Sequence, residues 1–506
     1  MPHSRSRRQF LARTAAGGAL AAAGELSFLS ALRPIAAEET QVKPGHVRLR
    51  PEIEPLVRLV EESPRDRLLE RMAEEIRRGT SYREVLAALM LAGVRNIKPR
   101  PVGFKFHAVL VVNSAHQASL ASADRDRWLP LFWALDYFKG SQARDVQEGD
   151  WTMSALPDSA LPSPDQARRR FVEAMDRWDE EGADAAVAQL ARTAPAGEVW
   201  EMFWRYGARD FRDIGHKAIY VANACRTLQV IGREHSEPVL RSLAFALLMR
   251  GNVNPAEADE PADRPWRRNL ERAKELGPGA LHGTRVDPAA TRELLSALHS
   301  GSPDDAAGRA AALLKSGVAP ASVWDGVMAG AGELLMRKPG IVGIHCVTTA
   351  NALHYAYSAA ASDETRLMML LQGAAFMPLF REAMGDPGDV RLDRLEPLAM
   401  QSSGPAAVEE VLADVSRSRM DAARKALGYL EAGGSAEELL AAARRLIFLK
   451  GTDSHDYKFS SAALEDYYHV SPEWRNRFLA SAMFNLRGAG DRDNPLTGRI
   501  RAALSG

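Results

Sequence analysis

One pattern recurs four times along the chain: an apolar helical stretch, a short break that contains glycine or proline, and a histidine that begins a second helix. The four histidines are His107, His216, His345 and His455. A repeat of this kind predicts helix pairs packed around a common axis, with equivalent positions facing the same centre. The chain has only 12 histidines among its 506 residues, so four of them in one register indicate a shared role.

The rest of the sequence is also helical in its periodicity. Apolar residues recur every three or four positions, alternating β-branched runs are scarce, and glycine and proline lie between the periodic segments. The predicted helices are 52–78, 82–94, 164–192, 238–250, 289–300, 306–316 and 407–430. With 46% apolar and 7% aromatic residues, the composition is that of a globular protein. We therefore predict an all-α fold, a helical bundle of quasi-repeated helix pairs around a central metal site.

Residues 1–37 predict an export signal rather than part of this fold. The run Ser6-Arg7-Arg8-Gln9-Phe10-Leu11 resembles a twin-arginine box, and a weakly apolar stretch and the small residues Ala36 and Ala37 follow it. A basic amphipathic helix is the alternative. The signal implies export of the chain by the twin-arginine (Tat) translocase to a periplasmic or exported location.

Residues 48–506 are predicted to form one all-helical domain of two pseudo-equivalent halves, joined by a proline-rich, charged connector at about 254–288. No stretch approaches the roughly 20 apolar residues of a membrane span, so we expect no stable span. The 65 basic residues balance 65 acidic ones, which argues against a nucleic-acid partner. Cys225 and Cys346 form no C-x-x-C motif, and nucleotide-binding and serine-hydrolase motifs are missing.

Four imidazoles that meet at one centre would form a metal site, because imidazole nitrogen suits iron, copper, nickel and zinc. Taken alone, each histidine is better explained as a core or helix-start residue. His116 is an alternative to His107, since the two lie in an H-x5-N-x2-H run that recurs at His345 and His354. Nine helical residues place the rings of such a pair on opposite faces, and the repeat register favours His107.

Lys458 lies three residues after His455, on the same helical face. A buried lysine beside a metal cation becomes neutral and can add carbon dioxide to form a carbamate. The alternative is a solvated lysine or an ion pair with Asp456.

Other polar residues near the histidines are candidates for the same site. Lys458 and Tyr457 are the predicted catalytic residues, and further tyrosines could line a substrate pocket or serve in packing, namely Tyr220 and Tyr355. Three aspartates could orient histidine nitrogens or cap helices: Asp213, Asp453 and Asp456. Cys346 could be a soft ligand or a buried inert thiol.

Three sequence runs resemble the questin oxidase-like family. They are Gly215-His216, the run from Gly343 through His345 to Leu353, and Asp453-x-His455-x-x-Lys458-Phe459 with Ala462-Ala463-Leu464. The resemblance spans roughly residues 50 to 480. It implies an all-helical oxygenase that opens a quinone ring by oxygen insertion or carbon–carbon cleavage.

The resemblance also implies a cofactor and its ligands. A characterised type in that family uses mononuclear non-haem iron, held by four histidines and a carbamylated lysine. Carried over to this chain, the ligands of Fe2+ would be His107 or His116, His216, His345, His455 and Lys458. The expected function is oxidation of an aromatic or quinone-like small molecule by O2.

Two other functions fit part of the pattern. A metal-dependent hydrolase can also combine histidines with a carbamylated lysine, although such enzymes usually have an H-x-H pair and a barrel of strands and helices. A non-catalytic helical-repeat protein would bind a partner through its concave face, and its histidines would be scattered over the surface.

Overall fold

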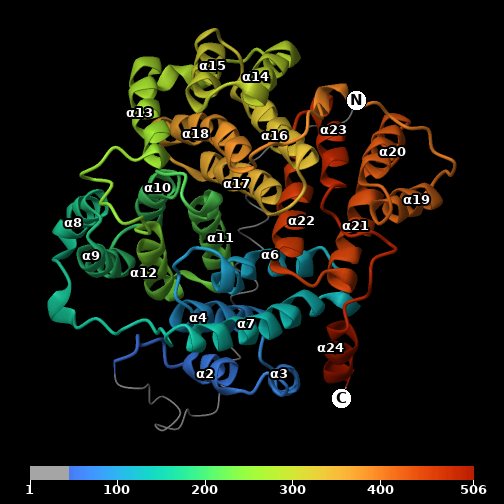
Figure 1. Ribbon diagram of the computed structural model, residues 1–506. Coiled ribbons are helices and arrows are strands. Elements are labelled where there is room, and N and C mark those ends of the chain that lie inside the picture. The colour runs from blue at the N-terminus through green and yellow to red at the C-terminus, as the bar shows by residue number, and fades with distance from the viewer. Residues whose placement is uncertain (1–44, 506) are drawn as a thin grey trace, which may run out of the picture.

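The computed structural model describes residues 45–505, and helices joined by short turns make up that range (Figure 1). Among the described residues there is no strand, and the β-type pairing consists of two isolated bridges, His46 with Ser154 and Arg285 with Val318. The all-α prediction is therefore confirmed. The predicted signal, residues 1–37, lies outside the described residues.

The helices of the first part of the chain surround α4 and α11. Their bounds are α2 (Glu54–Glu62), α3 (Leu68–Arg77), α4 (Tyr82–Asn96), α5 (His107–Leu110), α6 (Val112–Leu120), α7 (Leu129–Gln147), α8 (Pro164–Arg177), α9 (Glu180–Thr193), α10 (Ala196–Gly207), α11 (His216–Ile231), α12 (Ser236–Leu247) and α13 (Arg264–Leu276).

In the second part of the chain, α16 and α17 pack on each other, α14 packs on α16 and α18 packs on α17. The helices of this part are α14 (Pro288–Ser300), α15 (Pro303–Lys315), α16 (Pro320–Arg337), α17 (Ile341–Ala359), α18 (Asp363–Ala383), α19 (Pro405–Val415), α20 (Arg419–Glu431), α21 (Ala436–Lys450), α22 (Ser454–Asp466), α23 (Pro472–Ala482) and α24 (Leu496–Ser505). In Figure 1, α14 and α15 lie at one end of the molecule and α2 and α3 at the other.

Three stretches predicted as single helices are each two helices, and local backbone chemistry explains the breaks. After α2, Ser63 is extended and precedes Pro64, which disfavours the helical conformation before it. Trp178 ends α8 in the left-handed region at φ 60°, and Asp179 then caps α9 through the N–H of Gly182. Ser418 separates α19 from α20, because its hydroxyl caps the new helix at the N–H of Asp421.

The segment 254–288, predicted as the connector, contains α13 and short 3-10 turns. Helix α13 packs against α18 and α15, and Trp266 and Leu270 on it are partly buried against the core. The segment therefore covers part of the second half of the molecule as well as joining the halves.

Four helices each carry one of the four histidines near their first residue, namely α5, α11, α17 and α22. Helix α11 packs on α5 and α17, and α22 packs on α17 and α5. Helices α11, α17 and α22 lie near the centre of Figure 1. Because their histidine-bearing N-terminal ends face one another, the four helices form a bundle whose polar residues can meet at one end.

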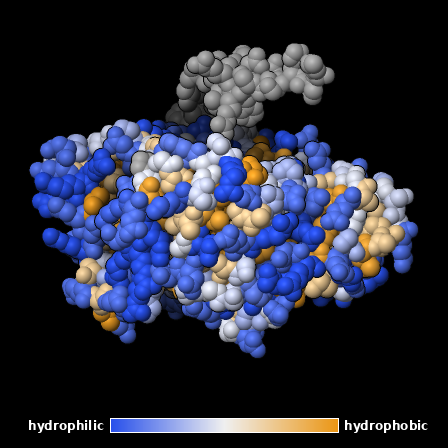
Figure 2. Space-filling view, turned by 90° about the horizontal axis from the view of Figure 1, so that it is seen from above, coloured by the Kyte–Doolittle hydropathy of each residue, from blue (hydrophilic) through white to orange (hydrophobic). Residues whose placement is uncertain are grey.

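The other helices enclose this bundle with apolar side chains. Most buried hydrophobic side chains belong to one connected core that runs through both halves, and the face seen in Figure 2 is mainly hydrophilic with scattered hydrophobic residues. Within residues 45–505, no helix combines the length and the apolar character that crossing a bilayer requires.

Candidate metal centre

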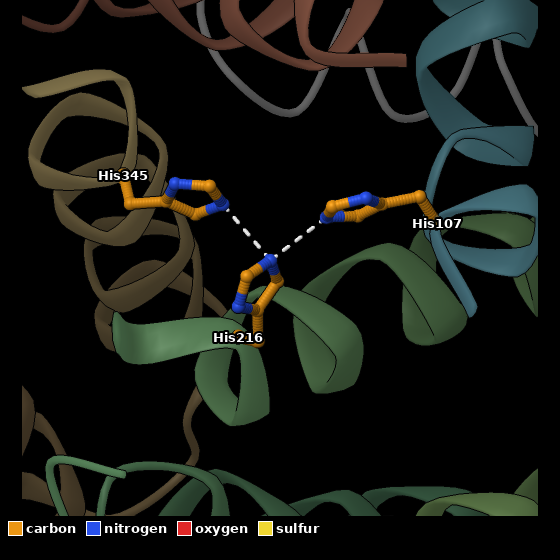
Figure 3. A group of neighbouring side chains, drawn as sticks. All are labelled: His107, His216 and His345. Carbon is orange, nitrogen blue, oxygen red and sulfur yellow. Dashed lines mark hydrogen bonds between the residues drawn. The ribbon is translucent and has the colours of Figure 1, made fainter. Parts of the chain in front are cut away.

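Three histidines from separate helices converge at the end of the bundle (Figure 3). The Nε2 atom of His216 lies 2.9 Å from Nε2 of His107 and 2.9 Å from Nε2 of His345. One nitrogen from each ring lies within 4.8 Å of the other two. The residues are only 6%, 4% and 0% exposed for His107, His216 and His345. Ligand atoms at this spacing can share one metal ion.

The other ring nitrogens fix the direction of two of these imidazoles. Nδ1 of His216 donates a hydrogen bond to the carbonyl oxygen of Asp213 at 2.6 Å, and Nδ1 of His345 donates to the carbonyl oxygen of Ile341 at 2.6 Å. In the neutral tautomers that make these bonds, each Nε2 presents a lone pair. The 2.9 Å contact between the two Nε2 atoms therefore needs a cation or a shared proton between them.

A shared proton is disfavoured at this depth. Burial lowers the pKa of His107, His216 and His345 well below the usual histidine value, and the nearby charge of Lys458 lowers all three further. The three residues therefore fit a metal cation better than a proton.

His455 brings a fourth ring to the same cluster. Its centroid lies 4.5 Å from that of His107 and 5.3 Å from that of His345. Its Nδ1 donates to Oδ1 of Asp453 at 2.5 Å, while its Nε2 is buried and has no hydrogen-bond partner. The acceptor of His455 is thus a carboxylate, whereas His216 and His345 donate to backbone carbonyls.

A strained turn places the carbonyl group that orients His216. Asp213 and Ile214 adopt left-handed conformations with φ of 53° and 44°, and Gly215 follows with φ 79°. A Cβ atom at Gly215 would lie 2.2 Å from Oγ1 of Thr349. Left-handed conformations cost a non-glycine residue about 1 kcal/mol or more, and such strain is found most often at functional sites.

Gly103 packs closely on the ring of His216. A Cβ atom at this position would lie 3.2 Å from Cε1 of His216 and 3.5 Å from its Nε2. The backbone of Gly103 is extended, with φ −178°, so close packing on the imidazole, and not an unusual conformation, is the reason for glycine here.

Lys458 is buried beside the histidines. The residue is 3% exposed, and its Nζ atom has no hydrogen-bond partner. Burial lowers its pKa to about 7, although Asp453 and Asp213 oppose that shift. The alternatives of a solvated lysine or a pair with Asp456 are wrong, since Asp456 binds Arg487 through both carboxylate oxygens.

The remaining predicted residues lie around the cluster or away from it. The structure brings His107 and not His116 to the centre, because Nδ1 of His116 contacts the hydroxyl of Tyr82 at 3.2 Å. The ring of Tyr457 stacks on Trp133 at 4.2 Å, and its buried hydroxyl has no partner. Tyr457 thus packs toward α7.

Other candidates serve structural contacts. Tyr220 donates to Ser242, and the ring of Tyr355 lies under the guanidinium of Arg226. Asp456 caps α22 through its bonds to the N–H groups of Thr452 and Asp453. The thiol of Cys346 is fully buried and donates to the carbonyl of Val342. These contacts favour the structural alternative for each residue.

Sequence reasoning missed three groups that shape the centre. Gly103 packs on the ring of His216, and the carbonyl of Ile341 accepts from His345. The buried, unpartnered hydroxyl of Thr349 lies beside Gly215. None of them belongs to a repeated spacing, and a carbonyl acceptor has no residue-type signal. The glycine before His216 is the one local signal that could have pointed to a close backbone approach.

Fold and site together define an all-α protein with a buried histidine cluster that can hold a metal ion. No family model, curated protein or solved structure matches this chain.

Proposed function

We propose that this protein is a metal-dependent oxidoreductase, a mononuclear non-haem iron oxygenase, in which His107, His216, His345 and His455 hold Fe2+. The observation that supports it most is the convergence of the Nε2 atoms of His107, His216 and His345. The rings of His216 and His345 already donate from Nδ1 to fixed carbonyl oxygens. Such an arrangement costs free energy without a cation, because lone pairs meet in a site closed to water.

The donor set also favours this class of metal. Imidazole nitrogens suit iron, copper, nickel and zinc, whereas magnesium and calcium prefer oxygen. When bound, iron would supply the redox chemistry that lets O2 react with an aromatic or quinone-like small molecule, by oxygen insertion or carbon–carbon cleavage. The chain contributes fixed imidazole directions, through Asp213, Ile341 and Asp453, and a core that excludes water.

Lys458 contributes an anionic group in this proposal. A lysine with a pKa of about 7 is about half uncharged at pH 7, so a large fraction of its amine can act as a nucleophile near neutral pH. The nitrogen lone pair forms a bond to the carbon of CO2, one proton leaves the nitrogen for solvent, and a carbamate with a charge of −1 results. That charge would offset part of the charge of the cation in a cluster of neutral imidazoles.

Elemental analysis of chain purified without added metal tests the proposal. We expect about one iron per chain, lost in His216→Ala and in His455→Ala but retained in His116→Ala, the matched control that lies outside the cluster. Iron-loaded chain should then consume O2 when supplied with phenols or quinones. Equal metal content in all variants would overturn the site, and two metal ions per chain without iron would favour the hydrolase instead.

A further inference from the structure

A cavity lies away from the metal centre, beside the connector between the two halves. It has a volume of about 600 Å³ and is bounded by α8 and α10 of the first half, by α13 of the connector and by α18 of the second half. Apolar and aromatic side chains form much of its wall, among them Met202, Tyr206, Trp266 and Leu270. Its volume is within the range of sites for small organic molecules.

One cation in the wall of this cavity has an incomplete set of hydrogen bonds. Arg209 is 8% exposed, and its Nη1 donates to the carbonyl of Met175 at 2.7 Å. Its Nε and Nη2 atoms are buried and have no acceptor. The guanidinium is held in place by stacking 4.0 Å above the ring of Trp178. A buried charge without a hydrogen-bonded anion is costly, so these two donors need an explanation.

In other arginines of this chain, the edge of the guanidinium formed by Nε and Nη2 binds a carboxylate. Among residues 45–505, Nε and Nη2 donate together to the two oxygens of one carboxylate in eight pairs. Four of them are Arg65 with Asp136, Arg241 with Asp184, Arg487 with Asp456, and Arg499 with Glu70. This side-on arrangement matches the spacing of carboxylate oxygens. Arg209 presents that edge without a carboxylate.

The acidic residues nearby already have partners. Asp176 accepts from the hydroxyl of Tyr206 at 3.0 Å, and Asp210 accepts from Lys217 at 2.8 Å. Glu201 accepts from the backbone N–H groups of Ala361 and Ser362, and Glu364 pairs with Arg205 at 3.0 Å. None of these carboxylates accepts from Nε or Nη2 of Arg209, and neither does Glu198, the exposed acidic residue that completes the acidic part of the wall. A carboxylate from outside the chain would supply the missing acceptor.

We propose that this cavity binds a small organic carboxylate with an apolar body, and that Arg209 receives the carboxylate through Nε and Nη2. The apolar body lies against Met202, Trp266 and Leu270. Because both donor atoms are buried, the ligand reaches them from the cavity by displacing the side chains that cover this edge. The site is separate from the metal centre and does not depend on the function proposed for it.

Isothermal titration of the full chain with indole-3-acetate, and with its neutral counterpart indole-3-acetamide, tests this site. We expect one saturable site for indole-3-acetate. Indole-3-acetamide should bind at least about tenfold more weakly, because the neutral amide cannot form a charge-assisted pair with Arg209. Arg209→Met should weaken acetate binding by a similar factor and bring it near the acetamide value. Arg309→Met, on an exposed arginine that pairs with Glu293, is the control and should bind as the unmodified chain does.

A second variant blocks the cavity without touching the cation. Gly197 lines the cavity, and a Cβ atom there meets nothing within 4 Å, so Gly197→Phe fills the space at little cost in packing. Gly197→Phe should abolish binding of indole-3-acetate. If circular dichroism shows that Arg209→Met does not fold, the result for Gly197→Phe tests the site in its place. The proposal would be overturned by equal binding of indole-3-acetate and indole-3-acetamide, by the lack of saturable binding of indole-3-acetate, or by unchanged binding in Gly197→Phe.

Discussion

At the residue scale, Asp453 joins the histidine cluster to the start of a helix. Its Oδ1 accepts from the backbone N–H of His455 at 2.8 Å, as the N-cap of α22, and from Nδ1 of the same residue at 2.5 Å. The bond to the imidazole lowers the pKa of the Asp453 carboxyl to about 2. The two roles differ in chemistry, since asparagine caps a helix nearly as well as aspartate but carries no charge.

We therefore expect Asp453→Asn to lower metal affinity by about 10- to 100-fold while leaving thermal stability of the metal-free chain nearly unchanged. Competition with a chelator of known affinity measures the first effect, and calorimetry the second. Asp179→Asn is the matched control, because Asp179 caps α9 without contacting a histidine. Equal affinity in both variants would show that the charge of Asp453 has no part in metal binding.

Lys139 gives a prediction about pH that does not involve the metal centre. Its ammonium donates to the carbonyl oxygens of Val60 and Glu61, and burial lowers its pKa from 10.5 to about 8. Between these values the unfolded chain binds more protons than the folded chain, so the contribution of Lys139 to the free energy of unfolding rises from pH 8 to 10.5.

Lys139→Met should flatten that rise. Urea unfolding at pH 7.5, 8.5 and 9.5 would measure it, with the exposed Lys315→Met as the control for general charge effects. The free energy of unfolding of the unmodified chain, minus that of Lys139→Met, should increase with pH. A difference that stays constant or shrinks over this window would contradict the assigned direction.

At the scale of elements, the sequence predicted the helices and their histidine-bearing ends because both follow periodic patterns. Apolar spacing predicted the helices, and the repeat register favoured His107 over His116. The helix that carries His107 is interrupted at Val111, which ends α5 and precedes α6. His107 and His116 therefore do not lie on one regular helix, as the spacing argument assumed. The covering loop at Gly103 and the turn at Asp213 were not predictable, since contacts between segments far apart in the chain leave no local pattern.

Gly103→Ala tests how closely that loop fits the imidazole. The added methyl would lie 3.2 Å from Cε1 of His216, and the ring cannot move away without weakening its bond to the carbonyl of Asp213. We expect lower metal occupancy with little loss of helical content, measured by elemental analysis and circular dichroism. Gly251→Ala is the control, because a Cβ atom there meets nothing within 4 Å. Full occupancy in Gly103→Ala would indicate that the loop can yield.

At the scale of the whole molecule, the cluster joins helices from both halves. His107 and His216 belong to the first half, and His345 and His455 to the second. The helices also pack directly, α11 against α17 and α6 against α22. A metal ion at this point would bind the folded chain alone, because the unfolded chain separates the four residues by more than a hundred positions at each step.

Removal of the metal should therefore lower the melting temperature of the entire chain and not of one half. A ligand that binds only the folded state at 100 times its dissociation constant adds about 2.7 kcal/mol to the free energy of unfolding, which for a chain of this size corresponds to a shift of a few degrees, ~2 to 5 °C. Differential scanning calorimetry with and without a chelator measures it. The chelator should shift the transition of the unmodified chain as a unit and leave that of His216→Ala where it was, because that variant has lost the site. A shift of equal size in both proteins would mean that the chelator acts elsewhere, and a shift confined to one of two separate transitions would mean that the four histidines do not hold the halves together through a common ion.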